Sequence, residues 1–426
     1  MKKILEKILA NLAKKIVVKY QPKIVGITGS IGKTSAKEAV SAVLATKFNI
    51  RKNIKNYNNE LGVPLTIIGA ESGGRSFTSW LGVWRKARQL IRETDRDYPE
   101  VLVLEMGADK PGDIEYLVDI APCFVGVVTT IGPTHLEAFG NVESVAREKQ
   151  KIVTHLDKSG FAVLNYDDEV VRAMAEKTKA NVVFYGQTDK AQIYALDLFN
   201  QGLAMDLDGI KFKITDGKSS VPVFLPGVVG IHQINCALIA AAVGHSFGMN
   251  LVEIAEGLKN YRAPKGRMNL IEGSDDILLL DDTYNSSPKA AIAALEALST
   301  LKLSAVERKG AILGDMLELG AYTDEAHFEL GKKAAELKLD FLVCVGINRE
   351  RMAAGASKNG LNSDQIFQFE NSEIAGQKVK ELLRSKDLIL IKGSQGSRME
   401  KVVKSLMRYP EKATDLLVRQ SADWIS

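Results

Sequence analysis

The sequence predicts an α/β protein in which a central domain with a mainly parallel sheet precedes a second, Rossmann-like α/β domain. Three observations predict it. Short continuous apolar runs alternate with helical segments along most of the 426 residues, as in parallel sheets covered by helices on both faces. A glycine-rich loop at residues 29–34 follows the first apolar run. Residues 261–266 (YRAPKG) interrupt the alternation, which then restarts, so the predicted parts are residues 1–22, 23–262 and 263–426.

The first segment, residues 1–20, is predicted to be one basic amphipathic helix. Ile4, Ile8, Leu12 and Ile16 fall on one face of it. Lysines occupy much of the remaining surface: Lys2, Lys3, Lys7, Lys14, Lys15 and Lys19. The segment is not a secretory signal, because lysines interrupt its apolar residues and no small-residue cleavage site follows. Two interpretations stay open: a helix packed on the first domain, which we favour, and an interfacial helix attracted to anionic lipid or to a protein.

The central domain is expected to contain five buried strands. Continuous apolar runs predict them at residues 23–28, 100–105, 123–130, 161–165 and 181–185. A helix is expected from the glycine loop to about Lys47. Shorter alternating segments with turn residues between 193 and 226 predict a small antiparallel patch, and the alanine-rich residues 230–244 predict another helix.

The second domain repeats the alternation of strands and helices. Its strands are predicted at residues 277–281, 309–313, 341–345 and 388–391. No internal repeat of short period and no low-complexity tract interrupts it.

The amino-acid composition argues against several classes of protein. A formal net charge of +4 is small for this length and argues against nucleic acid as the main partner. The three cysteines, Cys123, Cys236 and Cys344, are far apart and odd in number, which suits a reducing cytoplasm and not a disulfide framework or a zinc site. We expect a cytoplasmic monomer, with membrane association only through its first helix.

The loop Gly29-Ser-Ile-Gly32-Lys33-Thr34 has the arrangement of a phosphate-binding P-loop. Glycines let backbone N–H groups surround phosphate oxygens at a helix N-terminus, the lysine reaches the outer phosphates, and the threonine hydroxyl ligates Mg²⁺. The widest form of the motif needs a glycine at position 27, which here is isoleucine, and the glycine stands at Gly26. The position between a strand and a helix still predicts a P-loop ATPase domain.

Two further side chains follow neighbouring predicted strands. Glu105 ends a buried strand and is followed by Gly107, and His135 comes off the next strand. A carboxylate there is hard to explain by packing, and with the imidazole it would hold a second Mg²⁺, although Mg²⁺ prefers oxygen ligands. A single loop histidine is by itself more often only a polar residue, and the basic segment 145–151 alone indicates a solvated helix face.

These motifs resemble the Mur ligases, the ATP-dependent amide-forming enzymes of peptidoglycan precursor synthesis. In the first half the resemblance lies in residues 28–34 (TGSIGKT), 58–66 (NNELGVPLT), 105–107 (EMG) and 135–137 (HLE). In the second half it lies in residues 281–288 (DDTYNSSP), 313–320 (LGDMLELG), 392–394 (KGS) and 398–403 (RMEKVV). The second set is similar to the branch that adds D-alanyl-D-alanine to a UDP-muramoyl tripeptide.

The resemblance implies a role for each matching position. The ATP-binding residues would be Gly29, Ser30, Gly32, Lys33, Thr34, Ser35, His232, Asn235, Arg267 and Asp282, with His232 and Asn235 near the adenine, Arg267 at the γ-phosphate and Asp282 at the ribose. The metal ligands for two Mg²⁺ ions would be Thr34, Glu105, His135 and Lys149, the last as a carbamylated lysine. The catalytic set would be Lys33, Glu105, His135, Lys149 and Arg267.

The resemblance also implies the substrates. Asn58 and Asn59 would face the UDP-muramoyl peptide, while Asn285 and the segment Lys392, Gly393, Ser394 would bind the incoming dipeptide. Members of the branch carry a separate N-terminal uridine-binding domain, and only about 22 residues precede the first strand here. We therefore expect that domain to be absent, with the basic helix in its place.

The implied reaction is carboxylate activation by ATP to an acyl phosphate, followed by attack of the dipeptide amine, with domain closure completing the site. Three alternatives stay open. They are another ligase of the superfamily such as a folylpolyglutamate synthase, a P-loop NTPase or kinase without ligation, and a non-catalytic relative that binds precursor at the membrane.

Overall fold

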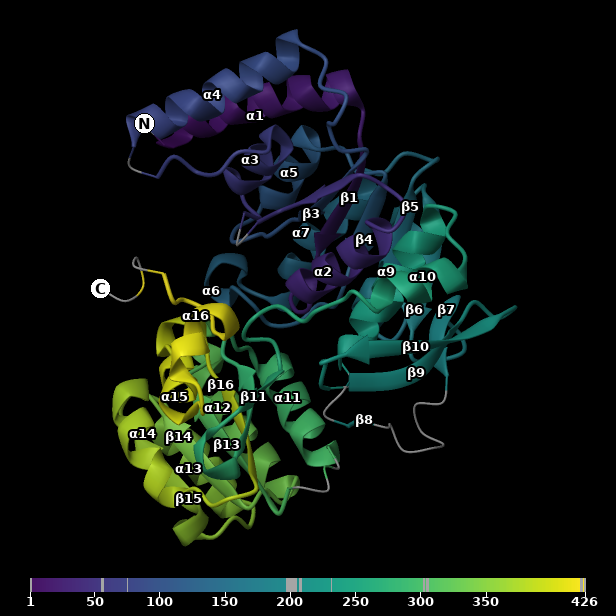
Figure 1. Cartoon of the computed structure of the whole chain (residues 1–426). Helices are drawn as coiled ribbons and strands as arrows, with labels where there is room; N and C mark the ends of the chain where they lie inside the picture. The colour runs from purple at the N-terminus through teal and green to yellow at the C-terminus, as the bar shows by residue number, and fades with distance from the viewer. Residues whose placement is uncertain are drawn as a thin grey trace. The chain divides into compact units, whose positions relative to one another are not determined.

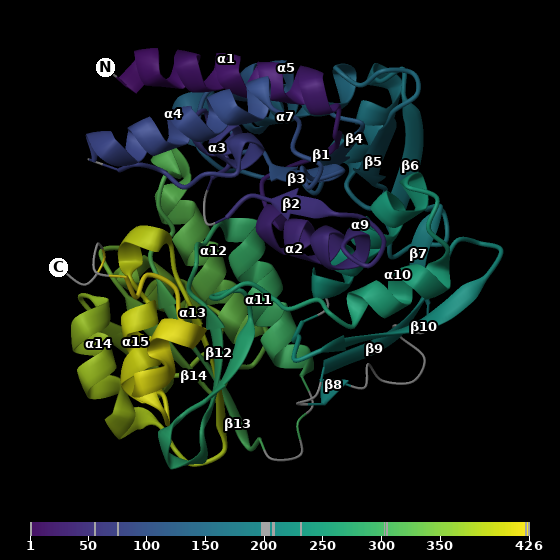
Figure 2. The same ribbon diagram turned by 45° about the horizontal axis from the view of Figure 1, so that its top comes forward.

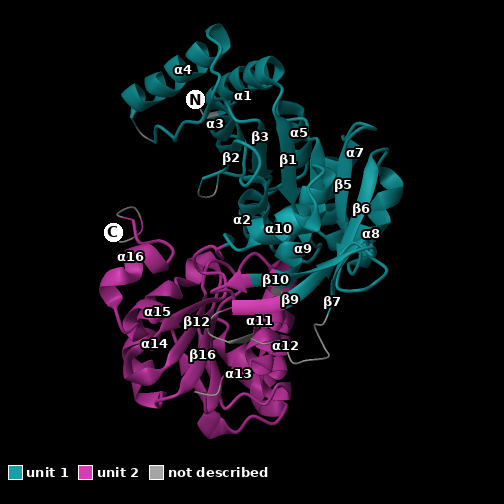
Figure 3. Cartoon of the chain, turned by 45° about the vertical axis from the view of Figure 1, so that its right-hand side comes forward, with its two compact units in different colours: residues 1–200, 212–224, 234–261 teal, residues 201–211, 225–233, 262–426 magenta. Residues whose placement is uncertain are grey.

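The computed structural model describes residues 2–54, 57–74, 76–196, 205–206, 209–230, 232–301, 303, 306–421 and 424. Two compact units make up the chain (Figure 3). Unit 1 consists of residues 1–200, 212–224 and 234–261, and unit 2 of residues 201–211, 225–233 and 262–426. Residues 201–211 and 225–233 thus belong to unit 2 although they precede the segment 261–266.

Unit 1 is built on a mainly parallel sheet, and the α/β class is as predicted (Figure 1). The strand order is β10-β9-β7-β6-β5-β4-β1-β3-β2, with β8 paired to β9; β8, the start of β9 and the end of β10 belong to the segments assigned to unit 2. The strands are β1 Lys23–Thr28, β2 Ile50–Lys52, β3 Val101–Glu105, β4 Val125–Val128, β5 Phe161–Asn165, β6 Asn181–Gly186, β7 Ile193–Leu196, β8 Met205–Asp206, β9 Gly209–Thr215 and β10 Ser220–Pro226. The strands from β2 to β7 in this order pair in parallel, and β9 pairs antiparallel with β7 and with β8.

Helices connect and cover these strands. They are α1 Lys2–Tyr20, α2 Lys33–Leu44, α3 Gly62–Ile68, α4 Phe77–Arg92, α5 Asp113–Ile120, α6 Leu136–Phe139, α7 Val142–Thr154, α8 Glu169–Arg172, α9 His232–Ser246 and α10 Leu251–Leu258. The sheet strands are apolar on both faces because helices lie on both, which explains their continuous apolar runs.

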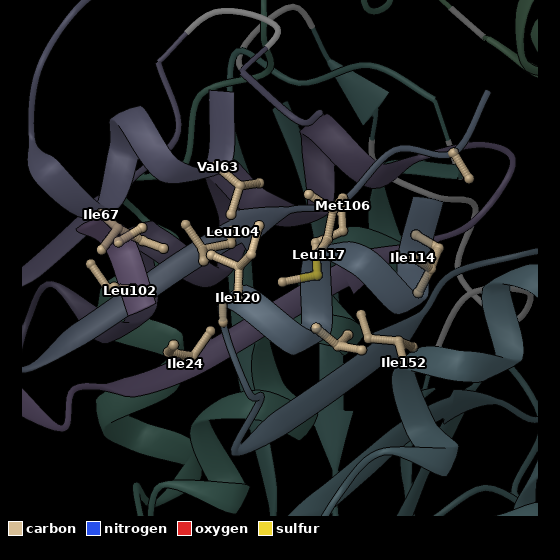
Figure 4. Close-up of a cluster of buried hydrophobic side chains, with 14 of the residues drawn as sticks. Ile24, Val63, Ile67, Leu102, Leu104, Met106, Ile114, Leu117, Ile120 and Ile152 are labelled. Carbon is tan, nitrogen blue, oxygen red and sulfur yellow. The ribbon is translucent and has the colours of Figure 1, made fainter. Parts of the chain in front are cut away.

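One face of the unit 1 sheet forms the core shown in Figure 4. Ile24 of β1 and Leu104 of β3 meet Leu117 of α5 and Ile152 of α7 there, all with at most 1% of their surface exposed. Alternate strand residues such as Val25 point to the opposite side, where α2 packs on β1 and β3. This two-sided burial fixes the strands whose ends carry the candidate site.

Helix α1 packs against this core, as the favoured interpretation predicts. Leu9, Ala13 and Ile16 are buried in it. The predicted apolar face is partly wrong, because Ile4 and Ile8 are exposed and the buried stripe runs through the neighbouring positions. Within the described residues, no helix combines the length and apolarity needed to cross a bilayer.

Unit 2 has its own six-stranded sheet in the order β11-β12-β16-β13-β14-β15. Only the β11–β12 pair is antiparallel. The strands are β11 Asn269–Glu272, β12 Leu278–Asp282, β13 Arg308–Gly314, β14 Phe341–Val345, β15 Ile366–Phe369 and β16 Asp387–Lys392. The helices are α11 Pro288–Thr300, α12 Thr323–Glu336, α13 Arg349–Lys358, α14 Ser372–Lys378, α15 Glu400–Leu406 and α16 Ala413–Leu416.

Candidate active site

The loops after β3, β1 and β4 meet at the carboxyl edge of the unit 1 sheet. Residue Ile27 of β1 is in register with Glu105 of β3, and Thr28 is in register with Val128 of β4. The glycine loop, the Glu105 carboxylate and the segment 129–135 therefore leave three adjacent strands at one level. This edge is where open α/β sheets bind ligands.

The glycine loop needs glycine at two positions. Gly29 has φ 141°, and a Cβ there would stand 1.9 Å from the hydroxyl oxygen of Thr129. Gly32 has φ 84° and is the residue from which α2 starts. L-amino acids rarely adopt either conformation, so both positions favour glycine. The tight turn leaves the N-terminus of α2 pointing out from the sheet edge, where it can bind an anion.

Three side chains follow Gly32 at the start of α2. Lys33 Nζ donates hydrogen bonds to the carbonyl oxygens of Gly29, at 2.7 Å, and Ser30, at 3.4 Å. Thr34 is half-buried and Ser35 is buried. The lysine thus folds over its own loop, within reach of any anion that the loop N–H groups bind.

Ser30 connects the glycine loop to the segment after β4. Its N–H donates to Thr130 O at 2.7 Å, and its hydroxyl pairs with both the carbonyl and the N–H of Gly132, at 3.0 and 3.1 Å. Thr134 adds a contact to the same hydroxyl at 3.2 Å. The serine predicted as a phosphate ligand therefore also fixes the loop that carries His135.

Polar side chains that were not predicted from the sequence hold the segment 129–135 after β4. Asn165 and Tyr185 donate to the carbonyl oxygen of Thr129, at 3.1 and 2.9 Å. Asp168 accepts from the Ile131 N–H at 3.0 Å and from the Thr130 hydroxyl at 3.1 Å. For Asn165 and Asp168, the signal in the sequence is the polar run of residues 165–168 at the end of a buried strand.

Glu105 is fixed from two sides at the end of β3. Its backbone N–H donates to Asn53 Oδ1 at 2.6 Å, and its carboxylate accepts from Asn58 Nδ2 at 3.2 Å. Only 5% of Glu105 is exposed. Asn53, also buried, was not singled out from the sequence, and it orients the residue that was.

Asn58 and Asn59 line a small, solvent-open hollow next to Glu105. The other lining residues are Glu60, Gly107, Asp109, Asp113 and Leu117. The Gly107 N–H donates to Asn58 O at 2.8 Å, and a Cβ at Gly107 would lie 3.1 Å from Asn58 Nδ2. The absence of a side chain at Gly107 lets the asparagine approach the carboxylate.

His135 has φ 53° and precedes α6. Its Nε2 lies 3.8 Å from Asp109 Oδ1, across the same hollow edge. The imidazole is half-exposed. It lies on the loop that Ser30 ties to the glycine loop, so its position depends on the nucleotide-binding segment.

Lys149 of α7 is buried, with 2% of its surface exposed. Burial, together with the nearby Lys33 ammonium, lowers the pKa of its amine to about 7, although Glu148, Asp109 and Glu105 oppose the shift. The helix face predicted as solvated thus includes a buried lysine among the candidate site residues. Near neutral pH much of its amine is uncharged and nucleophilic.

The candidate metal ligands suit a Mg²⁺ ion that phosphate oxygens also bind. They suit less well a metal ion held by protein ligands alone. In the part of the chain that the structure describes, no three His, Cys, Asp or Glu side chains cluster as a metal site. Glu105 supplies one carboxylate and Thr34 one hydroxyl at the mouth of the loop. Mg²⁺ is usually held by one or two carboxylates together with substrate phosphates, so this set is sufficient.

Residues predicted near the adenine lie at the start of α9. Asn235 Oδ1 accepts from Gln187 Nε2 at 3.2 Å, within unit 1. His232 is the first residue of α9, and its side chain lies outside the described part of the structure.

In unit 2, Arg267 stacks on Tyr284, with its guanidinium carbon 4.2 Å from the ring centroid. Its Nε is buried and has no hydrogen-bond partner among the described residues, although the residue as a whole is half-buried. An unused guanidinium N–H is a donor that an anion could accept from.

Asp282 and Lys392 form a buried ion pair at the ends of β12 and β16. Lys392 Nζ lies 2.6 Å from Asp282 Oδ2 and also donates to Asn285 O at 2.9 Å. Burial lowers the pKa of Lys392, and Asp282 opposes that effect. Only 2% of Lys392 is exposed, so its ammonium orients Asp282 and Asn285 and does not itself face solvent.

The remaining predicted substrate residues gather at the same carboxyl edge of the unit 2 sheet. Ser394 Oγ donates to Ser286 O at 3.1 Å and accepts from the Leu317 N–H at 2.9 Å. Asn285 Oδ1 accepts weakly from the Gln395 N–H, at 3.4 Å. Gly393 leaves room for Met399, because a Cβ there would stand 2.6 Å from Met399 Cγ.

Comparison with known proteins gives one family for both units. Residues 86–244 match the Mur ligase middle domain, and residues 266–395 match the glutamate ligase domain of Mur ligases. The UDP-N-acetylmuramoyl-tripeptide–D-alanyl-D-alanine ligase of Bacillus subtilis is 30% identical over 403 residues, which is 94% of this chain and 79% of that protein.

Two solved structures are similar over almost the whole chain. MurF from Acinetobacter baumannii is 26% identical with a TM-score of 0.79, covering 94% of this chain and 80% of that one. MurF ligase from Thermotoga maritima, solved in complex with ADP, is 27% identical with a TM-score of 0.76, covering 96% and 84%.

Proposed function

The chain belongs to the Mur ligase family, and from that membership we propose that it joins D-alanyl-D-alanine to a UDP-N-acetylmuramoyl tripeptide in peptidoglycan precursor synthesis, using ATP. The observation that carries the proposal is the carboxyl edge of the unit 1 sheet. There the glycine loop, Glu105 and the His135 loop leave adjacent strands and are tied together by Ser30. The ligase is favoured over a folylpolyglutamate synthase or an NTPase without ligation, because relatives that are 30–32% identical carry the name of this ligase.

The reaction activates a carboxylate and then transfers it to an amine. A carboxylate oxygen of the tripeptide attacks the γ-phosphorus of ATP, the bond to the β-phosphate oxygen breaks, and an acyl phosphate and ADP form. The dipeptide amine attacks the acyl carbon, and inorganic phosphate leaves from the tetrahedral intermediate. Lys33 and the N-terminus of α2 stabilise the charge on the transferred phosphoryl group.

We propose the following residues around the phosphates. Gly29, Ser30, Gly32 and Ser35 bind phosphate oxygens, while Thr34, Glu105, His135 and carbamylated Lys149 hold one or two Mg²⁺ ions. When bound, Mg²⁺ neutralises phosphate charge and orients the γ-phosphate. The choice of Thr34, Glu105 and His135 rests on the sheet edge that they share, and the choice of Lys149 rests on its proximity to Lys33, Asp109 and Glu105.

Carbamylation of Lys149 is supported by its surroundings. The neutral amine forms a bond to the carbon of CO₂ and loses one proton, giving an anionic carbamate. A pKa of about 7 supplies the neutral amine near neutral pH. The nearby Lys33 charge, which disfavours the ammonium form of Lys149, stabilises the carbamate instead.

For the second half we propose separate roles for the buried and the accessible groups. Arg267 neutralises the γ-phosphate, and Asp282 contacts the ribose. Asn285 and Ser394 bind the dipeptide, Gly393 keeps the segment close to Met399, and Lys392 acts by positioning Asp282 and Asn285. His232 and Asn235 are proposed near the adenine, and Asn58 and Asn59 near the UDP-muramoyl peptide.

We also propose that the chain works as a monomer in the cytoplasm. All three cysteines are free, which agrees with a reducing compartment.

A ligation assay tests the proposal. The chain is incubated with ATP, Mg²⁺, a UDP-muramoyl tripeptide and D-alanyl-D-alanine, and products are identified by mass spectrometry beside phosphate release. We expect one amide product per ADP and phosphate, dependent on the dipeptide. Phosphate release that is independent of the dipeptide, with no amide product, would contradict the proposal.

A further inference from the structure

Positive charge is concentrated on two neighbouring helices of unit 1. α1 and α4 pack side by side, as Figures 1 and 2 show. Together they carry ten Lys and Arg residues and one acid, Glu6, a net charge of +9. The whole chain has 56 basic and 52 acidic residues, so the other 391 residues carry 46 and 51, a net charge of −5. The basic character of the protein therefore belongs to these two helices.

The same helices expose large apolar side chains. Phe77 at the start of α4 is 82% exposed, and Ile4 of α1 is 65% exposed. Val18, Ile8 and Trp84 are also among the exposed apolar residues. Arg88 lies over the Trp84 ring at 3.7 Å, so an aromatic and a cationic group are paired at the surface. Aromatic and aliphatic side chains among Lys and Arg are typical of helices that lie in a membrane interface.

The two helices are held together as a preformed unit. Lys19 and Tyr20 at the end of α1 donate to the last carbonyl oxygens of α4, with Lys19 Nζ 2.9 Å and Tyr20 OH 3.0 Å from Leu90 O. The Tyr20 ring also stacks on Tyr98, with centroids 4.1 Å apart. The backbone that carries the exposed charges is therefore already ordered before a partner binds, which lowers the entropic cost of binding.

We propose that the exposed sides of α1 and α4 bind the surface of an anionic phospholipid membrane. Lys and Arg side chains such as Lys7, Lys15 and Arg88 attract the headgroups, while Phe77 and Ile4 enter the boundary with the acyl chains. A membrane explains the apolar residues as well as the charge, whereas an acidic protein partner would need only the charge. The inference does not depend on the ligase reaction.

Vesicle co-sedimentation of the full chain tests it. Vesicles of phosphatidylcholine alone are compared with vesicles that also contain phosphatidylglycerol, at low and high salt. We expect binding only to the anionic vesicles and loss of it at high salt, because salt screens exposed charges. The double variant Lys7→Glu/Lys15→Glu should lower the affinity at least about tenfold. The variant Phe77→Ser/Trp84→Ser should also lower the affinity for anionic vesicles, although it leaves the net charge unchanged.

A matched control changes the same charge elsewhere. Lys378 and Lys380 are exposed in unit 2, and Lys378→Glu/Lys380→Glu should leave vesicle binding unchanged. Circular dichroism and ligation of the soluble substrates check that each variant is folded. Absence of wild-type binding to anionic vesicles, an equal loss in the control, or binding only to an acidic protein would each overturn the proposal.

Discussion

At the scale of single residues, the nucleotide site depends on a lysine that folds over its own loop. Lys33 Nζ bonds to the Gly29 and Ser30 carbonyl oxygens. Phosphate oxygens carry full charge and are stronger acceptors than carbonyls, so the ammonium is expected to turn toward them when ATP binds.

Replacing Lys33 with alanine should abolish ligation while leaving the fold intact. The phosphoryl group loses its main protein cation, and a loss of roughly 10³-fold or more is expected. Formation of ADP and amide product measures the effect, and the thermal midpoint measures the fold. Lys47→Ala is the control, because the Lys47 ammonium forms an exposed ion pair with Glu253 and such pairs contribute little. A wild-type rate in the Lys33 variant would remove this residue from the mechanism.

Lys149 predicts a dependence of activity on CO₂ and pH. Its pKa of about 7 means that the reactive neutral amine prevails above pH 7 and is lost below it. Activity of CO₂-depleted enzyme should therefore be low, should fall further below pH 7, and should return with bicarbonate. Lys149→Ala should be inactive and regain activity with acetate or formate, which supply the missing carboxylate.

The control variant for Lys149 and a measurement of stability against pH both concern helix α7. Arg147→Ala, at an exposed position of α7, should stay active. The pKa of Lys149 lies below its unfolded value of 10.5, so the folded state binds fewer protons between about pH 7 and 10.5. Without CO₂ the free energy of unfolding should rise with pH across that window, and less so in Lys149→Met. Equal pH profiles, and no rescue by any carboxylate, would contradict a buried reactive amine.

At the scale of elements, each candidate site lies at the carboxyl ends of neighbouring parallel strands. In unit 2, Asp282 of β12 and Lys392 of β16 are register partners, and their ion pair joins the two strand ends. The pair is buried, so each charge relies on the other instead of on water.

Lys392→Met should destabilise unit 2 by about 3–5 kcal/mol, because it leaves the Asp282 carboxylate buried and unpaired. The double variant Asp282→Asn/Lys392→Met should lose less, since no charge remains. Urea unfolding followed by circular dichroism measures both. Lys386→Met removes an exposed ion pair with Glu307 and should cost at most about 1 kcal/mol. A double variant as unstable as the single one would show that the charge is not the cause.

The sequence predicts elements well where burial is continuous and poorly where it is not. Strands β1, β3, β5 and β14 are predicted to within one residue, because helices on both faces make most of their positions apolar. β2 was missed, since it has three half-buried residues and no apolar run. β11 and β15 were missed for the same reason: short, partly exposed strands at or near a sheet edge carry little pattern.

Site residues divide in a similar way. Lys33 and Glu105 could be predicted because a local motif or a strand end marks them. Asn53 could not, because it acts through a hydrogen bond to a residue 52 positions away. The basic run around Lys149 gives no sign of which lysine is buried, and the shifted pKa follows only from the packing of α7.

At the scale of the whole molecule, each of the two units contains a hydrophobic cluster of its own. One cluster of buried residues joins α1, α3, α5 and α7 to the unit 1 sheet, and another joins α14 and α15 to the unit 2 sheet. Units that each contain such a cluster are expected to unfold as separate cooperative blocks.

Calorimetry of the full chain should therefore show two unfolding transitions, and ATP with Mg²⁺ should raise chiefly the one that belongs to unit 1. Binding to the folded state alone stabilises it by about 2.7 kcal/mol at a ligand concentration of 100 times Kd. Lys33→Ala should cancel the shift, and Lys392→Met should lower only the other transition, which assigns each to its unit. Tryptophan fluorescence gives a second assignment of the transitions. Variants that keep only Trp80 and Trp84 of α4 report on unit 1, and a variant that keeps only Trp424 reports on unit 2. A single transition moved equally by ATP and by Lys392→Met would mean that the two units unfold as one block.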